Sequence, residues 1–145
     1  MRIFYCCAIS IVIAMLFIGC QKLPQGSYKG TYYLTFKDPQ DSIHNSMFSY
    51  KASVYDISDH YITINGSTLN RDSKKITGIF CVVSSLGEGP FKINIDAKWK
   101  KTNGKYRICG SFTTNFNYYQ TGDPENPWVV VHGTGTFELA YDSDF

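Results

Sequence analysis

Residues 91–119 constrain the fold most strongly, because residues 91–100 alternate strictly between apolar and polar side chains and a turn and a second strand follow them. One face of the first stretch carries Phe91, Ile93, Ile95, Ala97 and Trp99, and the other carries Lys92, Asn94, Asp96, Lys98 and Lys100. This period of two is typical of a strand with one face in the core and one in water. Asn103 and Gly104 can both adopt the positive φ that a type I′ turn requires. Tyr106–Tyr119 follows as a second strand. The pattern predicts an antiparallel hairpin in which Ile93, Ile95 and Trp99 are buried.

Weaker alternation recurs through the rest of the chain, separated by turn-forming residues. Further strands are predicted over 27–36, 47–57, 61–69, 76–85 and 128–141, with loops over 37–46, 58–60, 70–75, 86–90 and 120–127. Asn65-Gly66 interrupts the third of these strands as either a bulge or a turn. The run Ile79–Val83 is apolar at every position, which predicts a strand covered on both faces.

Seven or eight consecutive antiparallel strands, with no helical pattern after Cys20, indicate an all-β domain. The aromatic content of 16%, with 11 Tyr and 10 Phe, agrees with this class, because aromatic residues favour strands. A single up-and-down barrel is favoured over a β-sandwich, since closure removes the exposed edges that an open sheet leaves.

The amino terminus has the pattern of an export signal. Arg2 precedes an uncharged apolar run from Ile3 to Ile18 that ends in Gly19-Cys20. The run is shorter than the ~20 residues of a membrane-spanning helix, and no cluster of Lys or Arg follows it. We therefore interpret residues 1–19 as a signal peptide, 20–26 as a short disordered tether and 27–145 as the β-barrel domain.

The stretch Leu16-Phe17-Ile18-Gly19-Cys20 resembles the lipobox of bacterial lipoprotein precursors. The resemblance implies cleavage before Cys20 and acylation of Cys20, hence attachment to a membrane through the N-terminal lipid. Gln21 stands where an Asp would signal retention at the inner membrane, so the resemblance implies the outer membrane.

Two further motifs accompany the lipobox: Tyr28-Lys29-Gly30-Thr31-Tyr32 opens the domain and Gly133-Thr134-Gly135-Thr136-Phe137 closes it. With them the chain is similar to small calycin or lipocalin-like lipoproteins of Bacteroidetes. Gly30-Thr31-Tyr32 carries Tyr where lipocalins have Trp.

The cysteines divide by location. Cys6 and Cys7 belong to the predicted signal and Cys20 to the lipid site, which leaves Cys81 and Cys109 in the domain. An exported protein can form a disulfide between them. In a meander a third strand separates them by about 9–10 Å at the ~4.8 Å strand spacing, beyond the ~7 Å that a disulfide allows. Two free, largely buried thiols are the favoured prediction.

The motifs of known chemistry are absent from the sequence: it has no phosphate-binding loop, nucleophile elbow, H-E-x-x-H or C-x-x-C in the domain. His44, His60 and His132 are scattered and are predicted to lie on loops or the surface. Asp56, Asp59 and His60 are close in sequence, and a polar turn explains them better than a cation site. We expect a non-enzymatic protein without cofactor or metal, and the nearly balanced charge gives no indication of nucleic-acid binding.

Aromatic side chains are the remaining candidates for a ligand site. Those expected to line the barrel interior or its mouth are Tyr32, Trp99, Phe112, Phe116, Tyr118 and Trp128. Two hypotheses follow: a binder of a small apolar or amphipathic molecule, or a filled β-domain that presents loops such as Gln120–Pro127 to another envelope protein. Ordinary core packing explains the same aromatics.

Overall fold

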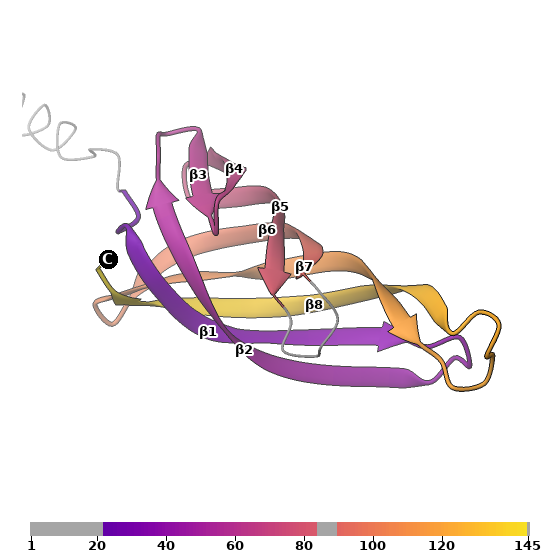
Figure 1. Ribbon diagram of the computed structural model, residues 1–145. Coiled ribbons are helices and arrows are strands. Elements are labelled where there is room, and N and C mark those ends of the chain that lie inside the picture. Colours follow the sequence, from indigo (N-terminus) through magenta and orange to yellow (C-terminus); the bar gives the residue numbers. More distant parts are fainter. Residues whose placement is uncertain (1–21, 84–89, 145) are drawn as a thin grey trace, which may run out of the picture.

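The chain forms one closed antiparallel β-barrel in which every strand pairs with its neighbours in sequence and β1 closes the ring with β8 (Figure 1). The computed structural model describes residues 22–83 and 90–144. Its strands are β1 (Gly26–Lys37), β2 (Ile43–Asp56), β3 (Tyr61–Ile64), β4 (Ser67–Asp72), β5 (Lys75–Val83), β6 (Pro90–Thr102), β7 (Lys105–Tyr119) and β8 (Trp128–Ser143). The predicted barrel is confirmed. The signal peptide, Cys20 and most of the 86–90 loop lie outside the described residues.

The hairpin predicted from strict alternation is confirmed. β6 and β7 pair from Ile93↔Thr114 to Thr102↔Lys105, and Asn103 and Gly104 form the turn with φ values of 50° and 77°. Ile93, Ile95 and Trp99 are buried. The side chain of Phe91, predicted to face inward, lies outside what the structure describes.

Asn65-Gly66 is a turn, with φ values of 49° and 78°, and it divides the predicted strand 61–69 into β3 and β4. This division of one predicted strand into two brings the number of strands to eight. β4 then continues through residues 70–72, which the sequence assigned to a loop, because Arg71 turns inward and its strand pairs with β5.

The strands are unequal in length, and this gives the barrel two different ends (Figure 1). β2 pairs with β1 from residue 43 onward but with β3 only over Val54–Asp56. The paired portions 43–48 of β2, 32–37 of β1, 114–119 of β7 and 128–135 of β8 therefore continue beyond the short strands as a curved four-stranded sheet, here called the distal sheet. The opposite, proximal end holds residues 22–25, the β2–β3 loop, the β4–β5 and β6–β7 turns and residue 144.

Three predictions need correction. The predicted tether is ordered from residue 22 onward: Leu23 is only 1% exposed and its N–H donates to Asp56. The predicted loop 37–46 is shorter, since β2 already begins at Ile43 and places His44 on a strand. β5 is covered on one face only, and Ile79 is 56% exposed, because each strand of a ring has one face toward the core and one toward solvent.

The thiols of Cys81 and Cys109 are free, as predicted, and β6 separates their strands. They are not largely buried: Cys81 is exposed and Cys109 is half-buried. Both occupy outward positions of the alternation, opposite Lys92 and Lys98 respectively. Register, rather than the apolar character of cysteine, decides their exposure.

Candidate ligand-binding site

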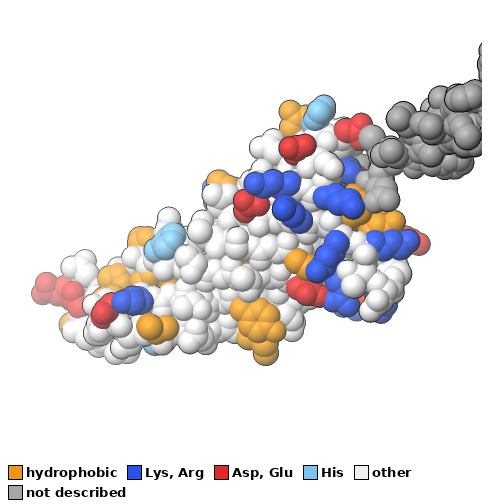
Figure 2. Space-filling view, turned by 180° about the vertical axis from the view of Figure 1, so that it is seen from behind, with side chains coloured by type: hydrophobic (Ala, Val, Ile, Leu, Met, Phe, Trp, Pro, Cys, Tyr) orange, Lys and Arg blue, Asp and Glu red, His pale blue; other side chains and the backbone are white. Residues whose placement is uncertain are grey.

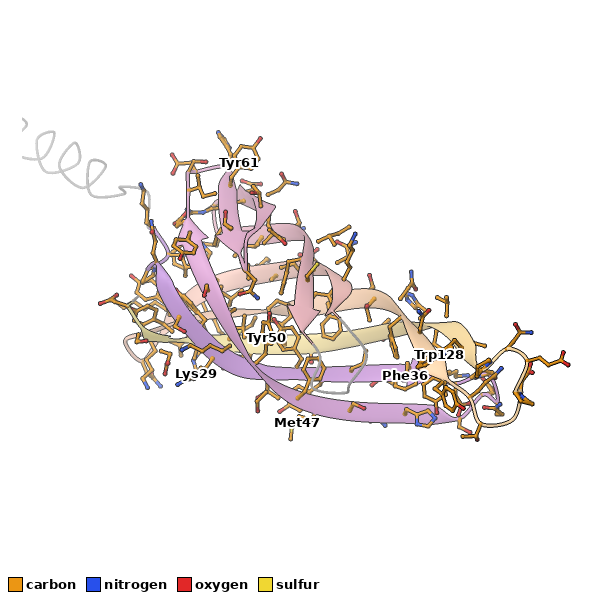
Figure 3. All side chains as sticks on the ribbon, in the orientation of Figure 1. Lys29, Phe36, Met47, Tyr50, Tyr61 and Trp128 are labelled. Atoms are coloured by element: carbon orange, nitrogen blue, oxygen red, sulfur yellow. The ribbon has the colours of Figure 1, made fainter. Side chains whose placement is uncertain are left out.

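The inner face of the distal sheet carries a cluster of aromatic rings from three strands. Phe36 of β1 stacks on His44 of β2 at 4.9 Å between centroids and meets the edge of Phe116 of β7 at 5.0 Å. Tyr118 lies 5.4 Å from Phe36 and 5.7 Å from His44. Phe36 is 9% exposed, whereas His44, Phe116 and Tyr118 are half-buried although they face inward. The four rings form an apolar surface at the distal end, where Figure 3 labels Phe36.

An acidic side chain holds His44 in this cluster. Asp38 Oδ2 lies 2.8 Å from His44 Nε2, and Asp38 Oδ1 accepts from the N–H groups of Gln40 and Ser42. The hydrogen bond with His44, reinforced by the two backbone donors, lowers the pKa of Asp38 below its ordinary value. The β1–β2 loop thereby fixes the orientation of the imidazole against Phe36.

The barrel centre, one layer further in, is filled. Tyr32 lies flat between Phe48 at 5.3 Å and Phe137 at 5.1 Å, with Phe112 at 5.8 Å. A Cβ atom at Gly135 would come within 2.5 Å of the Phe112 ring, so this glycine accommodates the ring. Among the described residues, Tyr32 and Phe112 are therefore core residues.

The hydroxyl of Tyr32 is buried and accepts or donates no hydrogen bond within the described part of the chain. Burial, reinforced by neighbouring Tyr50, raises the pKa of Tyr32. By contrast, the equally buried Tyr28 donates its hydroxyl proton to the Pro24 carbonyl at 2.8 Å.

Tyr32→Phe is expected to raise the free energy of unfolding by about 1–3 kcal/mol, because it removes a buried polar group without a partner. Tyr28→Phe, the matched control, should lower it by about 0.5–1.5 kcal/mol, because it removes a satisfied hydrogen bond. Urea denaturation of both variants measures the difference. A destabilised Tyr32→Phe would mean that the native hydroxyl has a partner.

Trp128 lies on the outer face of the distal sheet. It pairs with Tyr119, and the two rings meet edge to face at 5.1 Å. Trp128 and Tyr119 are each 51% exposed and Val130 is 71% exposed. Figure 3 shows Trp128 at the same end of the molecule as Phe36, and Trp128 directly follows the 120–127 loop. These three residues, Tyr119, Trp128 and Val130, are called the outer distal patch.

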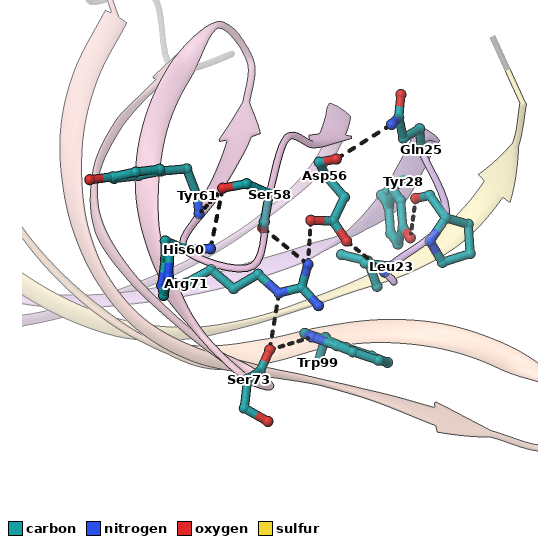
Figure 4. Close-up of polar contacts among 11 residues, drawn as sticks. Leu23, Gln25, Tyr28, Asp56, Ser58, His60, Tyr61, Arg71, Ser73 and Trp99 are labelled. Atoms are coloured by element: carbon teal, nitrogen blue, oxygen red, sulfur yellow. Dashed lines mark hydrogen bonds and ion pairs between the residues drawn. The ribbon is translucent and has the colours of Figure 1, made fainter. Parts of the chain in front are cut away.

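Trp99 lies at the proximal end, away from the other candidates, beside a buried ion pair (Figure 4). Arg71 pairs with Asp56, and its guanidinium also donates to the carbonyls of Ser73 at 3.0 Å and Ser58 at 3.4 Å. The Asp56 carboxylate accepts from the Leu23 N–H at 2.9 Å. Trp99 lies 5.9 Å from the Arg71 guanidinium and donates its indole N–H to Ser73 at 3.3 Å. This network closes the proximal end of the barrel.

The structure thus divides the six aromatic candidates. It brings Phe116 and Tyr118 together at the distal end and places Tyr32 and Phe112 in the central core. Trp99 lies at the proximal end, and Trp128 lies at the distal end but on the outer face of the sheet. Sequence reasoning missed Phe36 and His44 as members of the distal cluster. Extending the alternation of β1 and β2 toward the Asp38–Ser42 turn would have found them, because Phe36 pairs with His44 in register.

The acidic and histidine residues that the structure describes show no metal-binding arrangement. Among residues 22–83 and 90–144, no group of three or more His, Cys, Asp or Glu side chains is placed to hold an ion. Asp56 forms an ion pair with Arg71. Asp59 and His60 are exposed in the β2–β3 loop, as expected for a polar turn. His132 is exposed and lies 2.9 Å from Asn115 Oδ1.

The outer surface of β1, β7 and β8 has an open depression of about 420 Å³ lined by Lys29, Gly30, Thr31, Tyr33, Arg107, Glu138 and Ala140. Its charged groups are neutralised locally: Arg107 pairs with Glu138, and Lys29 lies 2.8 Å from Asp142. The depression is therefore a weaker candidate than the distal cluster.

No helix within the described residues is long and apolar enough to cross a membrane. In comparisons with known proteins, no family model matches this chain and no curated protein is significantly similar to it.

Proposed function

We propose that this protein is a lipid-anchored envelope protein that binds a small apolar or amphipathic molecule, without catalysis, at the inner face of its distal sheet. One observation carries the proposal: Phe116, Tyr118 and His44 face inward yet remain half-buried, whereas Tyr32, Phe48 and Phe112, which face inward nearer the centre, are buried. Apolar walls with a few oriented polar groups are the usual composition of small-molecule sites. Here the polar groups are the Tyr118 hydroxyl and the His44 imidazole held by Asp38.

Binding at this surface is expected to depend on Phe116 and Tyr118. Replacing both with alanine should weaken binding of an apolar fluorescent probe to the full-length protein by at least about tenfold, since each aromatic contact contributes about 0.5–1.5 kcal/mol beyond its buried area. Native mass spectrometry of protein purified from its host identifies a bound molecule. Unchanged probe affinity in the double variant would contradict the inner-face site.

A second function, docking to another envelope protein, is favoured by the outer distal patch. Its Trp128 and Tyr119 rings are exposed beside a loop that contains Pro124 and Pro127. Aromatic residues are enriched in protein interfaces. Trp128→Ala separates the two functions: it should leave probe binding unchanged because Trp128 faces away from the inner cluster, whereas it should weaken capture of a protein partner.

Lipid attachment is a separate prediction, motivated by the lipobox. Wild-type protein should incorporate a palmitate analogue during growth, and Cys20→Ala should not, since the thiol and the new amino group are the acylation sites. Several acyl chains at ~0.8 kcal/mol per buried methylene make the attachment stable, unlike a single chain. Cys81→Ala is the control, and equal labelling of Cys20→Ala and wild type would refute the assignment.

A further inference from the structure

The N-terminal segment is fixed to the proximal end of the barrel, and this determines where the preceding residues join the fold. Leu23 is buried, its N–H donates to Asp56, and the Pro24 carbonyl accepts from Tyr28. Only two residues separate Cys20 from Leu23, so their Cα atoms are at most ~11 Å apart. A chain held in a bilayer through its N-terminus therefore keeps the proximal end close to that bilayer.

The same end carries a concentration of positive charge. The tip of the β6–β7 hairpin runs from Lys98 to Arg107 without an acidic residue, and Lys74 lies in the adjacent β4–β5 turn. Its exposed lysines, here called the basic tip, are Lys98, Lys100, Lys101 and Lys105. Among the residues that the structure describes, none of these four lysines forms an ion pair. Figure 2 shows most of the visible Lys and Arg side chains over this half of the molecule, with Asp and Glu side chains among them.

Three nearby acidic groups are paired with cations, while Asp59, Asp72 and Asp144 are exposed at the same end, fewer than the lysines there. Asp96 pairs with Lys75 at 3.1 Å, Glu138 with Arg107, and Asp142 with Lys29. In the distal sheet and its two loops, all of which the structure describes, the one lysine is Lys37, and it pairs with Asp41. The formal net charge of the whole chain is only +2. The exposed lysines are therefore concentrated at the proximal end and do not reflect a general excess of positive charge.

Exposed apolar side chains accompany the basic tip at the proximal end. The β2–β3 loop follows Asp56, the residue that binds the Leu23 N–H, and presents Ile57 and the neighbouring Tyr61, which are 58% and 50% exposed. Figure 3 places Tyr61 on β3 at the top of the view, well away from Phe36 and Trp128 at the right. Tyrosine with lysine is typical of the membrane–water interface, where an apolar body and a polar or charged tip are both accommodated.

We propose that the proximal end is a membrane-docking surface on which the basic tip contacts anionic phospholipid headgroups and Ile57 and Tyr61 enter the interfacial layer. The inference rests on the proposed membrane attachment and adds an orientation to it. In this orientation the proximal end of the barrel contacts the bilayer, and the distal aromatic cluster faces away from it. Juxtamembrane lysines are attracted to anionic lipid over about a Debye length, so salt weakens the contact.

Lysine footprinting of the full-length protein, purified from its host and inserted into lipid nanodiscs, tests this orientation. Discs of phosphatidylcholine alone are compared with discs that also contain phosphatidylglycerol, and mass spectrometry measures the rate at which an amine-reactive reagent modifies each lysine. We expect Lys100, Lys101 and Lys105 to react at least about threefold more slowly in the anionic discs, and high salt to restore their rates. Lys37, at the distal end, should react equally in both.

Equal rates for the basic tip in the two discs, or equal slowing of Lys37, would overturn the proposal. The triple variant Lys100→Gln, Lys101→Gln, Lys105→Gln should raise the rates at Lys98 and Lys74 in anionic discs, while the control Lys37→Gln should not. The intact mass of the same preparation reports whether Cys20 is acylated. Chain that is not processed is expected to enter the discs through its apolar residues 1–19, so the footprint can be measured with or without acylation. The intact mass therefore reports failure of lipidation, and the lysine rates report failure of docking.

Discussion

Replacing Asp56 with alanine is expected to lower the free energy of unfolding by about 3–5 kcal/mol, because it leaves the Arg71 guanidinium charged and buried without its counter-ion. Asp56 and Arg71 are 4% and 6% exposed, so water cannot replace the lost carboxylate. The variant also removes the acceptor of the Leu23 N–H and should release the N-terminal segment from the barrel. Urea denaturation measures the loss, and hydrogen exchange at Leu23 measures the release.

Asp96→Ala is the matched control, since Asp96 also pairs with a basic residue but its side chain is 60% exposed. Its expected cost is under about 1 kcal/mol, as for other surface ion pairs. The double variant Asp56→Leu, Arg71→Leu should be less destabilised than Asp56→Ala, because it removes both buried charges together. Equal losses for Asp56→Ala and Asp96→Ala would contradict the buried network.

Replacing Ile95 with alanine is expected to cost about 2–5 kcal/mol, because it opens a cavity in a filled core. Ile95 is 3% exposed and stands between Gly78 of β5 and Phe112 of β7. Both neighbouring strands are hydrogen-bonded to β6, which limits collapse around the smaller side chain. Thermal or urea unfolding measures the loss.

Lys98→Ala is the control on the same strand, three residues away and on the outer face. It should change stability by less than about 0.5 kcal/mol, as exposed substitutions usually do. Similar shifts for the two variants would contradict the assigned register of β6.

In the proposed function the two ends of the barrel have different roles. Buried charge at the proximal end holds the N-terminal segment, and a filled aromatic layer around Tyr32 separates that end from the distal sheet. A ligand at the distal cluster would therefore contact Phe36, Phe116 and Tyr118 without entering the centre. Recognition and membrane attachment are then located at opposite ends.

The candidate site was only partly predictable from the sequence. Alternation correctly placed Phe116 and Tyr118 on the inner face of β7, since a residue's face follows from its parity alone. It could not tell that Tyr32 and Phe112 fill the centre while Trp99 packs against Arg71, because depth along a barrel depends on which strands end early. Parity also explains why Trp128 faces outward: successive residues of a strand point to opposite faces, and its neighbour Val129 faces inward.

The sequence by itself determined the class of fold, the β6–β7 hairpin and its register, because a period of two and an Asn-Gly turn are local properties of the backbone. Only the tertiary structure decided that β2 begins at Ile43, that Arg71 is buried in a segment that reads as a polar loop, and that Cys81 is exposed in a stretch that reads as core. The start of β2 depends on the pairing of Ile43 with Lys37 across the β1–β2 turn, and the exposure of Cys81 depends on closure of the ring, which leaves its side chain on the outer face. The burial of Arg71 depends on Asp56, 15 residues away in the sequence. Burial of a charge is favourable only where a distant opposite charge meets it, and no local pattern encodes that meeting.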